Sequence, residues 1–243
     1  MSIRTKIIKR ALQILEELFF YPKLRKQLKN TLNNDSLILD VGANNGQSID
    51  FFRTIAPKCK IVSFEPNPEL FTKLLDKYKN DKNLTLSNLG ISNKSGFLEF
   101  NINKLDLTSS FEPLNYNSKY LIKKAAILGV SVEEIISKKI NVPVSTLVDY
   151  LTENNISKVD LLKIDTEGHE YQCLESLFIP SENGLNTGIE RIQIENHQDE
   201  MYLSAVSFDK IQQLLVDNKY IVESKIKHPF GNFFELIYKR SEA

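Results

Sequence analysis

The sequence is poor in cysteine, has no excess of charge of either sign and contains no long apolar run. Cys59 and Cys173 are the only cysteines, too few for the disulfide framework of a small secreted domain, and they favour a reducing compartment. Lysine plus arginine and aspartate plus glutamate each number 31, which argues against bulk binding of nucleic acid because that binding needs a basic surface. No run approaches the roughly 20 apolar residues of a membrane-spanning helix. We therefore expect a cytoplasmic protein without a targeting segment.

The balanced charge conceals a basic segment at the start of the chain. The first 30 residues hold eight basic residues against two acidic ones, Glu16 and Glu17. Apolar residues recur there at helical spacing, which predicts an amphipathic helix that Pro22 ends or restarts. This helix either touches an anionic membrane surface or a phosphorylated substrate, or packs on the domain with its lysines in solvent. We favour packing, because the two glutamates interrupt the basic face, and we treat 1–30 as an amphipathic extension of a domain spanning 31–243.

Short apolar runs alternate with helical segments along the rest of the chain. Strands are expected over 37–41, 61–64, 84–86, 96–103, 159–164 and 191–195, and helices over 47–55, 68–78, 168–177 and 208–218. This alternation predicts an α/β fold with a mostly parallel sheet. The segments 220–226 and 233–238 predict an antiparallel pair that closes the sheet.

Residues 106–141 interrupt the alternation. They carry Thr108, Ser109 and Ser110, followed by helical segments around 120–128 and 132–138. An insertion between core strands is a natural place for a lid over a substrate. We favour a lid over a surface insertion without a role.

The first motif that carries chemistry is Asp40-Val41-Gly42-Ala43-Asn44-Asn45-Gly46, between a strand and a helix. Ligands of open α/β sheets bind beside the carboxyl ends of the strands, where Gly42 allows a sharp turn and Gly46 a close approach. The glycine spacing is G-x-x-x-G, not the G-x-G-x-x-G of a dinucleotide site. An acid just before the glycines suits an ammonium group, so Asp40 points to S-adenosylmethionine.

Two further strand ends add to a cofactor site. Glu65, in Phe64-Glu65-Pro66-Asn67-Pro68, stands where an acid accepts hydrogen bonds from both hydroxyls of a ribose. A solvent-exposed acid at a strand end is the alternative. Asn88 and Leu89 follow the third strand, where small and polar residues line an adenine pocket.

Acidic residues and a histidine follow two later strands. Asp165 ends the strand over 159–164, while Glu167 and Glu170 fall in the first turn of the next helix, where the helix dipole favours negative charge. Glu195 and His197 alternate at the end of a later strand, so both can face one cleft. His197 is a candidate general base near neutral pH, and a structural or surface histidine is the alternative.

In order and spacing these motifs resemble the FkbM family of S-adenosylmethionine-dependent methyltransferases. The resemblance runs from about residue 37 to residue 197 and rests on five segments, Asp40 to Gly46, Phe64 to Asn67, Gly90 to Gly96, Thr146 to Leu151 and Val159 to Glu170. It implies a class I methyltransferase fold, a three-layer Rossmann-like sandwich whose seven-stranded sheet has an antiparallel last strand. It also implies O-methylation of a sugar, a glycan or a glycosylated natural product. The cofactor contacts that it implies are Asp40, Gly42, Asn44, Gly46, Glu65, Asn67, Asn88 and Leu89.

For the transfer itself we expect alignment of the reacting atoms to dominate. His197 is the proposed base, Glu195 orients it, and Asp165 lies beside the reacting methyl group. Asp165 and Glu195 could instead bind a divalent metal, an alternative that we do not favour. Two rival functions stay open: a nicotinamide-dependent oxidoreductase, which the glycine spacing opposes, and a non-catalytic interaction module of the same fold.

Overall fold

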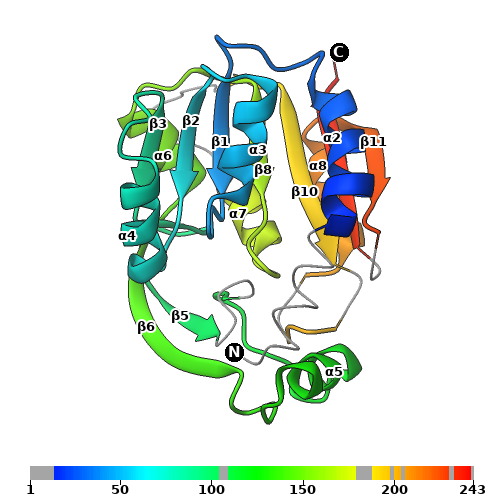
Figure 1. The fold of residues 1–243 in the computed structure, drawn as a ribbon. Coiled ribbons are helices and arrows are strands. Elements are labelled where there is room, and N and C mark those ends of the chain that lie inside the picture. The colour runs from blue at the N-terminus through cyan, green and yellow to red at the C-terminus, as the bar shows by residue number, and fades with distance from the viewer. Residues whose placement is uncertain are drawn as a thin grey trace.

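The computed structural model describes residues 14–103, 109–178, 188–197, 200–203, 206–229 and 233–241. Its centre is a seven-stranded sheet with the strand order β11-β12-β10-β8-β1-β2-β3 (Figure 1). The strands are β1 (Leu37–Val41), β2 (Lys60–Phe64), β3 (Leu84–Ser87), β8 (Leu161–Ile164), β10 (Arg191–His197), β11 (Tyr220–Lys227) and β12 (Phe233–Arg240). β12 is antiparallel to both of its neighbours, and the other pairs are parallel. The predicted sheet with its antiparallel last strand is confirmed.

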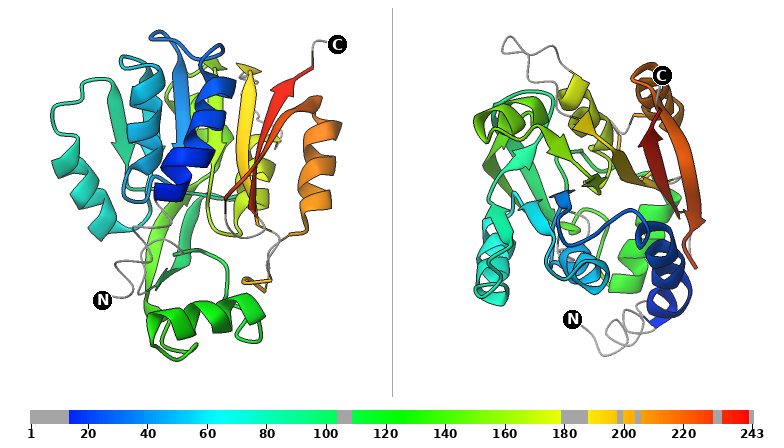
Figure 2. Two further views of the ribbon diagram at one scale, coloured as in Figure 1. Left: turned by 45° about the vertical axis from the view of Figure 1, so that its right-hand side comes forward. Right: turned by 90° about the horizontal axis from the view of Figure 1, so that it is seen from above.

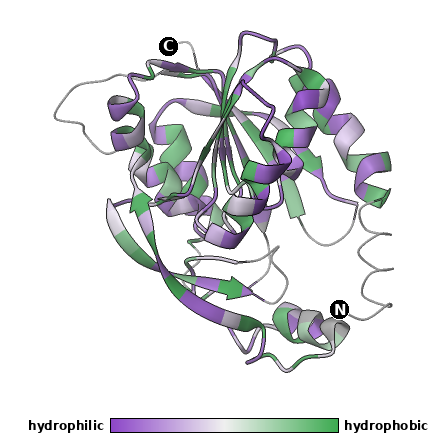
Figure 3. Ribbon diagram, turned by 60° about the vertical axis from the view of Figure 1, so that its left-hand side comes forward, coloured by the Kyte–Doolittle hydropathy of each residue, from purple (hydrophilic) through white to green (hydrophobic). Residues whose placement is uncertain are grey.

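Helices cover both faces of this sheet. Seen from above in Figure 2, one face carries α2, α3 and α4 and the other carries α6, α7 and α8. The helices are α2 (Tyr21–Leu28), α3 (Gln47–Ile55), α4 (Pro68–Lys77), α6 (Leu147–Glu153), α7 (Glu170–Phe178) and α8 (Phe208–Asp217). Figure 3 shows hydrophobic and hydrophilic residues alternating along them, as expected of helices with one buried face.

The central strands are buried on both faces, which explains their apolar sequences. In β1, Leu39 and Val41 pack in the core under α6 and α7, whereas Ile38 packs in the core under α2 and α3. Successive side chains of a strand point to opposite faces, so a strand covered by helices on both sides is apolar at most of its positions. This burial leaves the carboxyl ends of the strands as the place for polar residues.

The segment after Pro22 forms part of the domain core, because Leu24 and Leu28 of α2 are buried with Ile49 of α3. Before Pro22, Phe20 is buried, but Ile14, Leu15, Leu18 and Phe19 of the predicted apolar face are exposed, so packing of that face on the domain stays a prediction. Pro22 lies in the first turn of α2, directly after the π-helix η1 (Glu16–Phe20). Residues 1–13 lie outside the described residues, so the first half of the predicted helix does too. The domain boundary at residue 30 and a membrane contact stay predictions.

A second, three-stranded sheet carries the insertion below the main sheet in Figure 1. It comprises β4 (Gly90–Ile91), β5 (Gly96–Asn103) and β6 (Ile136–Ser145), in the order β4-β6-β5, and α5 (Lys119–Leu128) lies within the insertion. The helix predicted around 132–138 is wrong, because β6 begins at Ile136 and pairs there with Asn103 of β5. This long-range pairing overrides the local helical pattern.

Two smaller features complete the fold. β7 (Lys158–Val159) pairs with β9 (Gly188–Ile189), so the single strand predicted over 159–164 is interrupted. The interruption falls at Asp160, whose Oδ2 accepts a hydrogen bond from the amide of Leu37 at 2.8 Å. No helix in the described ranges is long and apolar enough to cross a lipid bilayer.

Candidate active site

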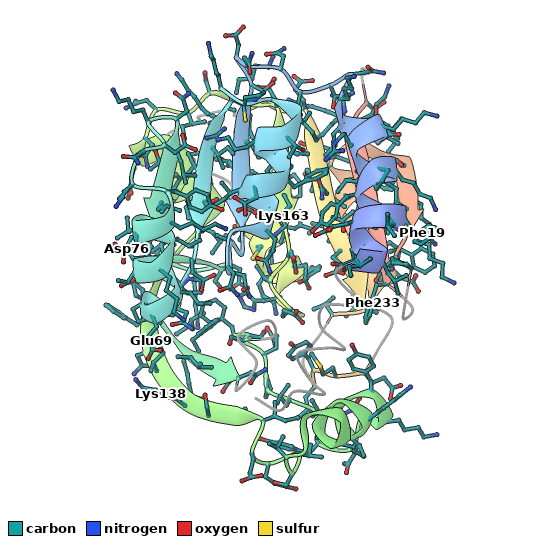
Figure 4. The ribbon with its side chains drawn as sticks, in the orientation of Figure 1. Phe19, Glu69, Asp76, Lys138, Lys163 and Phe233 are labelled. Atoms are coloured by element: carbon teal, nitrogen blue, oxygen red, sulfur yellow. The ribbon has the colours of Figure 1, made fainter. Side chains whose placement is uncertain are left out.

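A cavity of about 340 Å³ lies at the carboxyl ends of β1, β2, β8 and β10. Its wall also includes residues of η1, of α2, of the β11–β12 pair and of the insertion. Open α/β sheets bind their ligands at this position, and the volume falls in the ordinary range of small-molecule sites. Lys163 extends from β8 at the middle of the sheet (Figure 4) and belongs to the wall.

Glu65 presents a buried carboxylate to this cavity. Its Oε2 accepts a hydrogen bond from the amide of Asn44 at 2.8 Å, and its Oε1 accepts one from the amide of Asn67 at 2.9 Å. Burial raises the pKa of Glu65 to about 7, although these two amides lower it. Each oxygen keeps a second lone pair, so the carboxylate can still accept two hydroxyl groups. The alternative of a solvent-exposed acid is excluded by its 5% exposure.

Asp40, Lys163 and Asp165 form a row of alternating charge across β1 and β8. The Lys163 Nζ lies 3.3 Å from Oδ1 of Asp40 and 3.3 Å from Oδ2 of Asp165. Burial lowers the pKa of Lys163, but the two carboxylates raise it, and the net shift is upward. Asp40 is fully buried and also accepts hydrogen bonds from the hydroxyls of Ser48 and Ser63. In this structure the cation beside Asp40 is therefore Lys163.

Glycines at both ends of the first motif make close contacts with the protein itself. A Cβ at Gly42, which has φ +90°, would lie 2.0 Å from the backbone oxygen of Asp165. A Cβ at Gly46, φ +83°, would lie 2.3 Å from the hydroxyl of Tyr78. Gly42 thus allows the loops after β1 and β8 to meet, and the predicted close approach at Gly46 is to Tyr78. Asn44 lines the cavity with φ +49°.

The residues predicted beside Glu65 hold its loop in place. The side chain of Asn67 caps α4 by accepting a hydrogen bond from the amide of Glu69. The Asn88 Nδ2 donates to the carbonyls of Glu65 and Pro66 at 2.8 and 3.2 Å. Leu89 lines the cavity directly.

A second charged group lies at the β10 side of the cavity. Glu195 of β10 lies directly opposite Glu235 of β12 in the strand register. The Nε2 of His228, just after β11, lies 3.5 Å from Glu195 Oε1 and 3.6 Å from Glu235 Oε2. Gln193 donates from Nε2 to Glu235 at 2.7 Å. Burial lowers the pKa of His228, but the carboxylates of Glu16, Glu235 and Glu195 outweigh burial and raise it to about 9.

The loop after β8 joins the site to the insertion. Glu170 begins α7, and its carboxylate accepts hydrogen bonds from the amides of Thr166 and Gly168, the capping role expected of it. Glu167 lies before the helix, with φ +56°, and its carboxylate accepts a hydrogen bond from Tyr202 at 3.0 Å. Ser109 of the insertion also lines the cavity. Closure of the insertion as a lid stays a prediction.

The sequence predicted Glu65, Asp165 and Glu195 as site residues, and all three line this cavity. Five further charged residues of the wall were not predicted as site residues, namely Glu16, Lys163, Glu167, His228 and Glu235. Lys163 was visible as the single charge inside the buried strand Leu161–Ile164, a signal that such a residue is paired. His228 and Glu235 gave no comparable local signal. The side chain of His197 lies outside the described part, and its backbone ends β10 opposite Phe233. Within the described residues, no three histidine, cysteine, aspartate or glutamate side chains gather as a metal site.

The family model of the methyltransferase FkbM domain matches residues 40–222, three quarters of the chain. The chain belongs to this family. A curated relative, the 2-O-methyltransferase NoeI of Sinorhizobium fredii, is 25% identical over 157 residues, which cover 61% of this chain and 60% of NoeI. A crystal structure of methyltransferase FkbM from Methylobacillus flagellatus is similar with a TM-score of 0.52 and 13% identity, over 86% of this chain and 44% of that one. The chain therefore spans about three fifths of the curated relative that it matches.

The match confirms the predicted resemblance to the FkbM family, whose model is described as a methyltransferase domain. The likeness to the Methylobacillus structure agrees with the predicted class I methyltransferase fold. The described residues fit the cofactor, because the buried Glu65 carboxylate has acceptor capacity left at the cavity wall. The family match also favours methyl transfer over the nicotinamide-dependent alternative.

Proposed function

We propose that this FkbM-family chain transfers a methyl group from S-adenosylmethionine to a hydroxyl oxygen of a sugar or sugar-bearing compound. The observation that carries the proposal is a cavity with two separate polar groups, Glu65 at β2 and Glu195 with Glu235 at β10 and β12. Three strand spacings of about 4.8 Å separate β2 from β10, so the two groups lie on the order of 14 Å apart. One cavity thus has room for a cofactor and an acceptor side by side.

The cofactor half is built around Glu65. Its carboxylate would accept both hydroxyls of the ribose, Leu89 would contact the base, and Asn44 and Gly42 would form the turn against the amino-acid end. Asp40 would position the turn at the amino-acid end of the cofactor indirectly. It pairs with Lys163, and Lys163 donates a hydrogen bond to the carbonyl of Gly42 at 3.2 Å. When bound, S-adenosylmethionine supplies an electrophilic methyl carbon for the acceptor oxygen.

The acceptor half is built around Asp165 and Glu195. Both carboxylates line the cavity, so they can accept hydrogen bonds from acceptor hydroxyls and hold one of them in line for transfer. Little charge develops that needs stabilisation, so positioning is the main contribution of these residues. A base then takes the hydroxyl proton, and His197, two residues beyond Glu195, keeps that proposed role.

Two features support oxygen as the atom that is methylated. The relative NoeI is named as a 2-O-methyltransferase. The acceptor half also presents carboxylates, which pair with hydroxyl donors. A non-catalytic binding module remains the second candidate, and it predicts cofactor binding without transfer.

The test combines binding and transfer in one protein. Isothermal titration calorimetry with S-adenosylmethionine should show binding that Glu65→Gln weakens at least about tenfold, the loss of hydrogen bonds to a charged acceptor. Glu99→Gln is the matched control, because Glu99 pairs with Lys139 on the surface of β5 and β6, where both side chains are more than half exposed. Binding without transfer to any glycoside would favour the binding module. No binding at all would contradict the proposal.

A further inference from the structure

Part of the cavity wall comes from outside the region that matches the FkbM family model. The model matches residues 40–222, yet Glu16, Phe20 and Tyr21 line the cavity from before it, and His228 and Glu235 line it from after it. These residues gather at the β10 side, beside Glu195. Because they lie outside the matched domain, they are the part of the wall expected to be particular to this chain.

The charges along the whole cavity wall are strongly unequal. The lining residues described by the structure include six carboxylates, Glu16, Glu65, Asp165, Glu167, Glu195 and Glu235, against two basic side chains, Lys163 and His228. Lys163 is engaged by Asp40 and Asp165. His228 faces three carboxylates, since its Nδ1 lies 3.8 Å from Glu16 and its Nε2 faces Glu195 and Glu235. Carboxylates therefore outnumber basic side chains six to two among the described lining residues.

Two buried polar atoms in the same wall make no hydrogen bond among the described residues, although one of them lies at ion-pair distance from Glu195 and Glu235. They are Oε1 of Gln193 and Nε2 of His228, in residues that are 4% and 8% exposed. One is an acceptor and the other a donor when the imidazole is protonated. A buried polar atom without a partner costs free energy, so this pair indicates a place where a ligand supplies both an acceptor and a donor. A hydroxyl group supplies both.

The ring of His228 is held in a fixed position. It stacks on Phe20 with 3.9 Å between the ring centroids and 23° between the planes, and Phe233 contacts its edge. Its backbone amide donates to the carbonyl of Phe233 at 3.1 Å. The imidazole thus offers Nε2 to the cavity without freedom to turn away.

We infer that Gln193, Glu195, His228 and Glu235, with Glu16 at the rim, form an acceptor subsite for an uncharged polyhydroxylated ring and reject acceptors that carry phosphate or carboxylate. The inference rests on the proposed function and adds the substrate class to it. An acceptor hydroxyl accepts a hydrogen bond from His228 Nε2 and donates one to Gln193 Oε1. The surrounding carboxylates repel an anionic group on the same ring.

The subsite also sets the order of reactions. A sugar joined to a nucleotide carries phosphates next to its ring, which the subsite would exclude. Methylation by this chain therefore follows the reaction that removes the phosphate, namely glycosyl transfer from the nucleotide sugar or hydrolysis of the phosphate ester.

The test uses the full chain, tritium-labelled S-adenosylmethionine and matched acceptors. Methyl glycosides of several hexoses and deoxyhexoses are each paired with their phosphate monoesters, and KM and kcat are measured. We expect label in the neutral glycosides and at least a tenfold higher KM for the phosphate esters. Equal or better use of the phosphate esters would overturn the inference while leaving the proposed function intact. Label in neither set, with the cofactor bound, would instead contradict the proposed function.

Two further measurements separate electrostatic rejection from a steric clash. Glu235→Gln should narrow the KM difference between the paired acceptors several-fold, whereas the surface control Glu99→Gln should leave it unchanged. If Glu235→Gln does not fold, salt serves the same purpose with the unmodified chain. Raising the salt concentration should lower KM for the phosphate ester and not for the neutral glycoside, because salt screens charge repulsion. A KM ratio insensitive to both changes would contradict charge as its cause.

Discussion

The ammonium group of Lys163 lies 3.3 Å from the carboxylate of Asp40, the acid that sequence reasoning assigns to the cofactor. Both groups are buried, with side chains 8% and 0% exposed. Asp40 thus meets a cation of the chain itself, and Lys163 carries its effect to the carbonyl of Gly42 and to Asp165. The ion pairs Asp40–Lys163 and Lys163–Asp165 connect the buried strands β1 and β8 to the cavity wall. The first prediction concerns the stability that Lys163 provides.

Lys163→Met should lower the free energy of unfolding by about 3–5 kcal/mol, because it leaves Asp40 as a buried charge without its cation. The measurement is urea denaturation at pH 7. The double variant Asp40→Asn with Lys163→Met should recover part of the loss, since it removes the stranded charge as well. A loss below about 1 kcal/mol in the single variant would contradict the buried ion pair.

The affinity for S-adenosylmethionine should fall as the pH drops from 8 to 6. The pKa of Glu65 is raised to about 7, so below that pH the group becomes protonated and no longer accepts both ribose hydroxyls. One pH unit on the acid side of the pKa corresponds to at most about a tenfold change in affinity. Calorimetric titrations at several pH values give the profile. Glu65→Gln should bind S-adenosylmethionine weakly, with an affinity that does not change with pH. A strong pH dependence in that variant would mean that another group titrates, and it would contradict the assignment to Glu65.

His228 should add stability at neutral pH that disappears in alkali. Its pKa is raised from 6.5 to about 9 in the folded chain, so its contribution is complete below about pH 6.5 and is lost as the pH rises through 9. At about 1.4 kcal/mol for each pKa unit, this shift corresponds to roughly 3–4 kcal/mol. Chemical denaturation of the parent chain and of His228→Gln at pH 6, 8 and 10 tests this. The free energies of unfolding of the two proteins should become equal at pH 10. A difference between them that is the same at all three pH values would contradict a contribution from protonated His228.

Gly42→Ala should be much more destabilising than Gly129→Ala. Both glycines have positive φ, +90° and +70°, but a Cβ at Gly42 would meet the Asp165 backbone at 2.0 Å, whereas a Cβ at Gly129 has nothing within 4 Å. Backbone strain alone costs about 1 kcal/mol, so the second variant isolates that part. We expect a loss of roughly 3 kcal/mol or more at Gly42, measured by thermal or urea unfolding. Similar losses in both variants would mean that the β1 and β8 loops can separate freely.

His197→Ala should lower kcat by about 10²- to 10⁴-fold, the contribution of a general base, and leave cofactor affinity unchanged. Single-turnover transfer to the best neutral glycoside measures the chemical step. Unchanged turnover with normal cofactor binding would remove His197 from the mechanism and leave proton transfer to Asp165, Glu195 or solvent.

The parts of the fold that the sequence predicts are those with a local signal. The strand at Leu37–Val41 and the helix at Gln47–Ile55 match their predicted ranges, because an apolar run closed by glycine and a helical period are both local features. The start of β6, Ile136 to Lys138, was predicted as helix because its local pattern is helical, whereas it takes its structure from pairing with β5. A distant partner supplies that information.

The same contrast between local signals and long-range pairing separates the predictable residues of the site from the others. Asp165 and Glu195 were predictable because Asp165 follows the apolar strand β8 and Glu195 lies near the end of β10, and the carboxyl ends of parallel strands share one edge of the sheet. His228 and Glu235 were not, since they reach the cavity only when the antiparallel pair β11 and β12 closes the sheet beside α2. The position of Phe20 against His228 likewise joins residues more than 200 positions apart in the chain.

The most direct test of the account is the position of the methyl group on a transferred product. The full chain, S-adenosylmethionine and a neutral glycoside are incubated, and the product is analysed by NMR and mass spectrometry. The account predicts S-adenosylhomocysteine in equal amount with a glycoside that has gained one methyl group as an O-methyl ether on a ring hydroxyl. A methyl group on nitrogen or carbon, or consumption of the cofactor without a methylated glycoside, would contradict it.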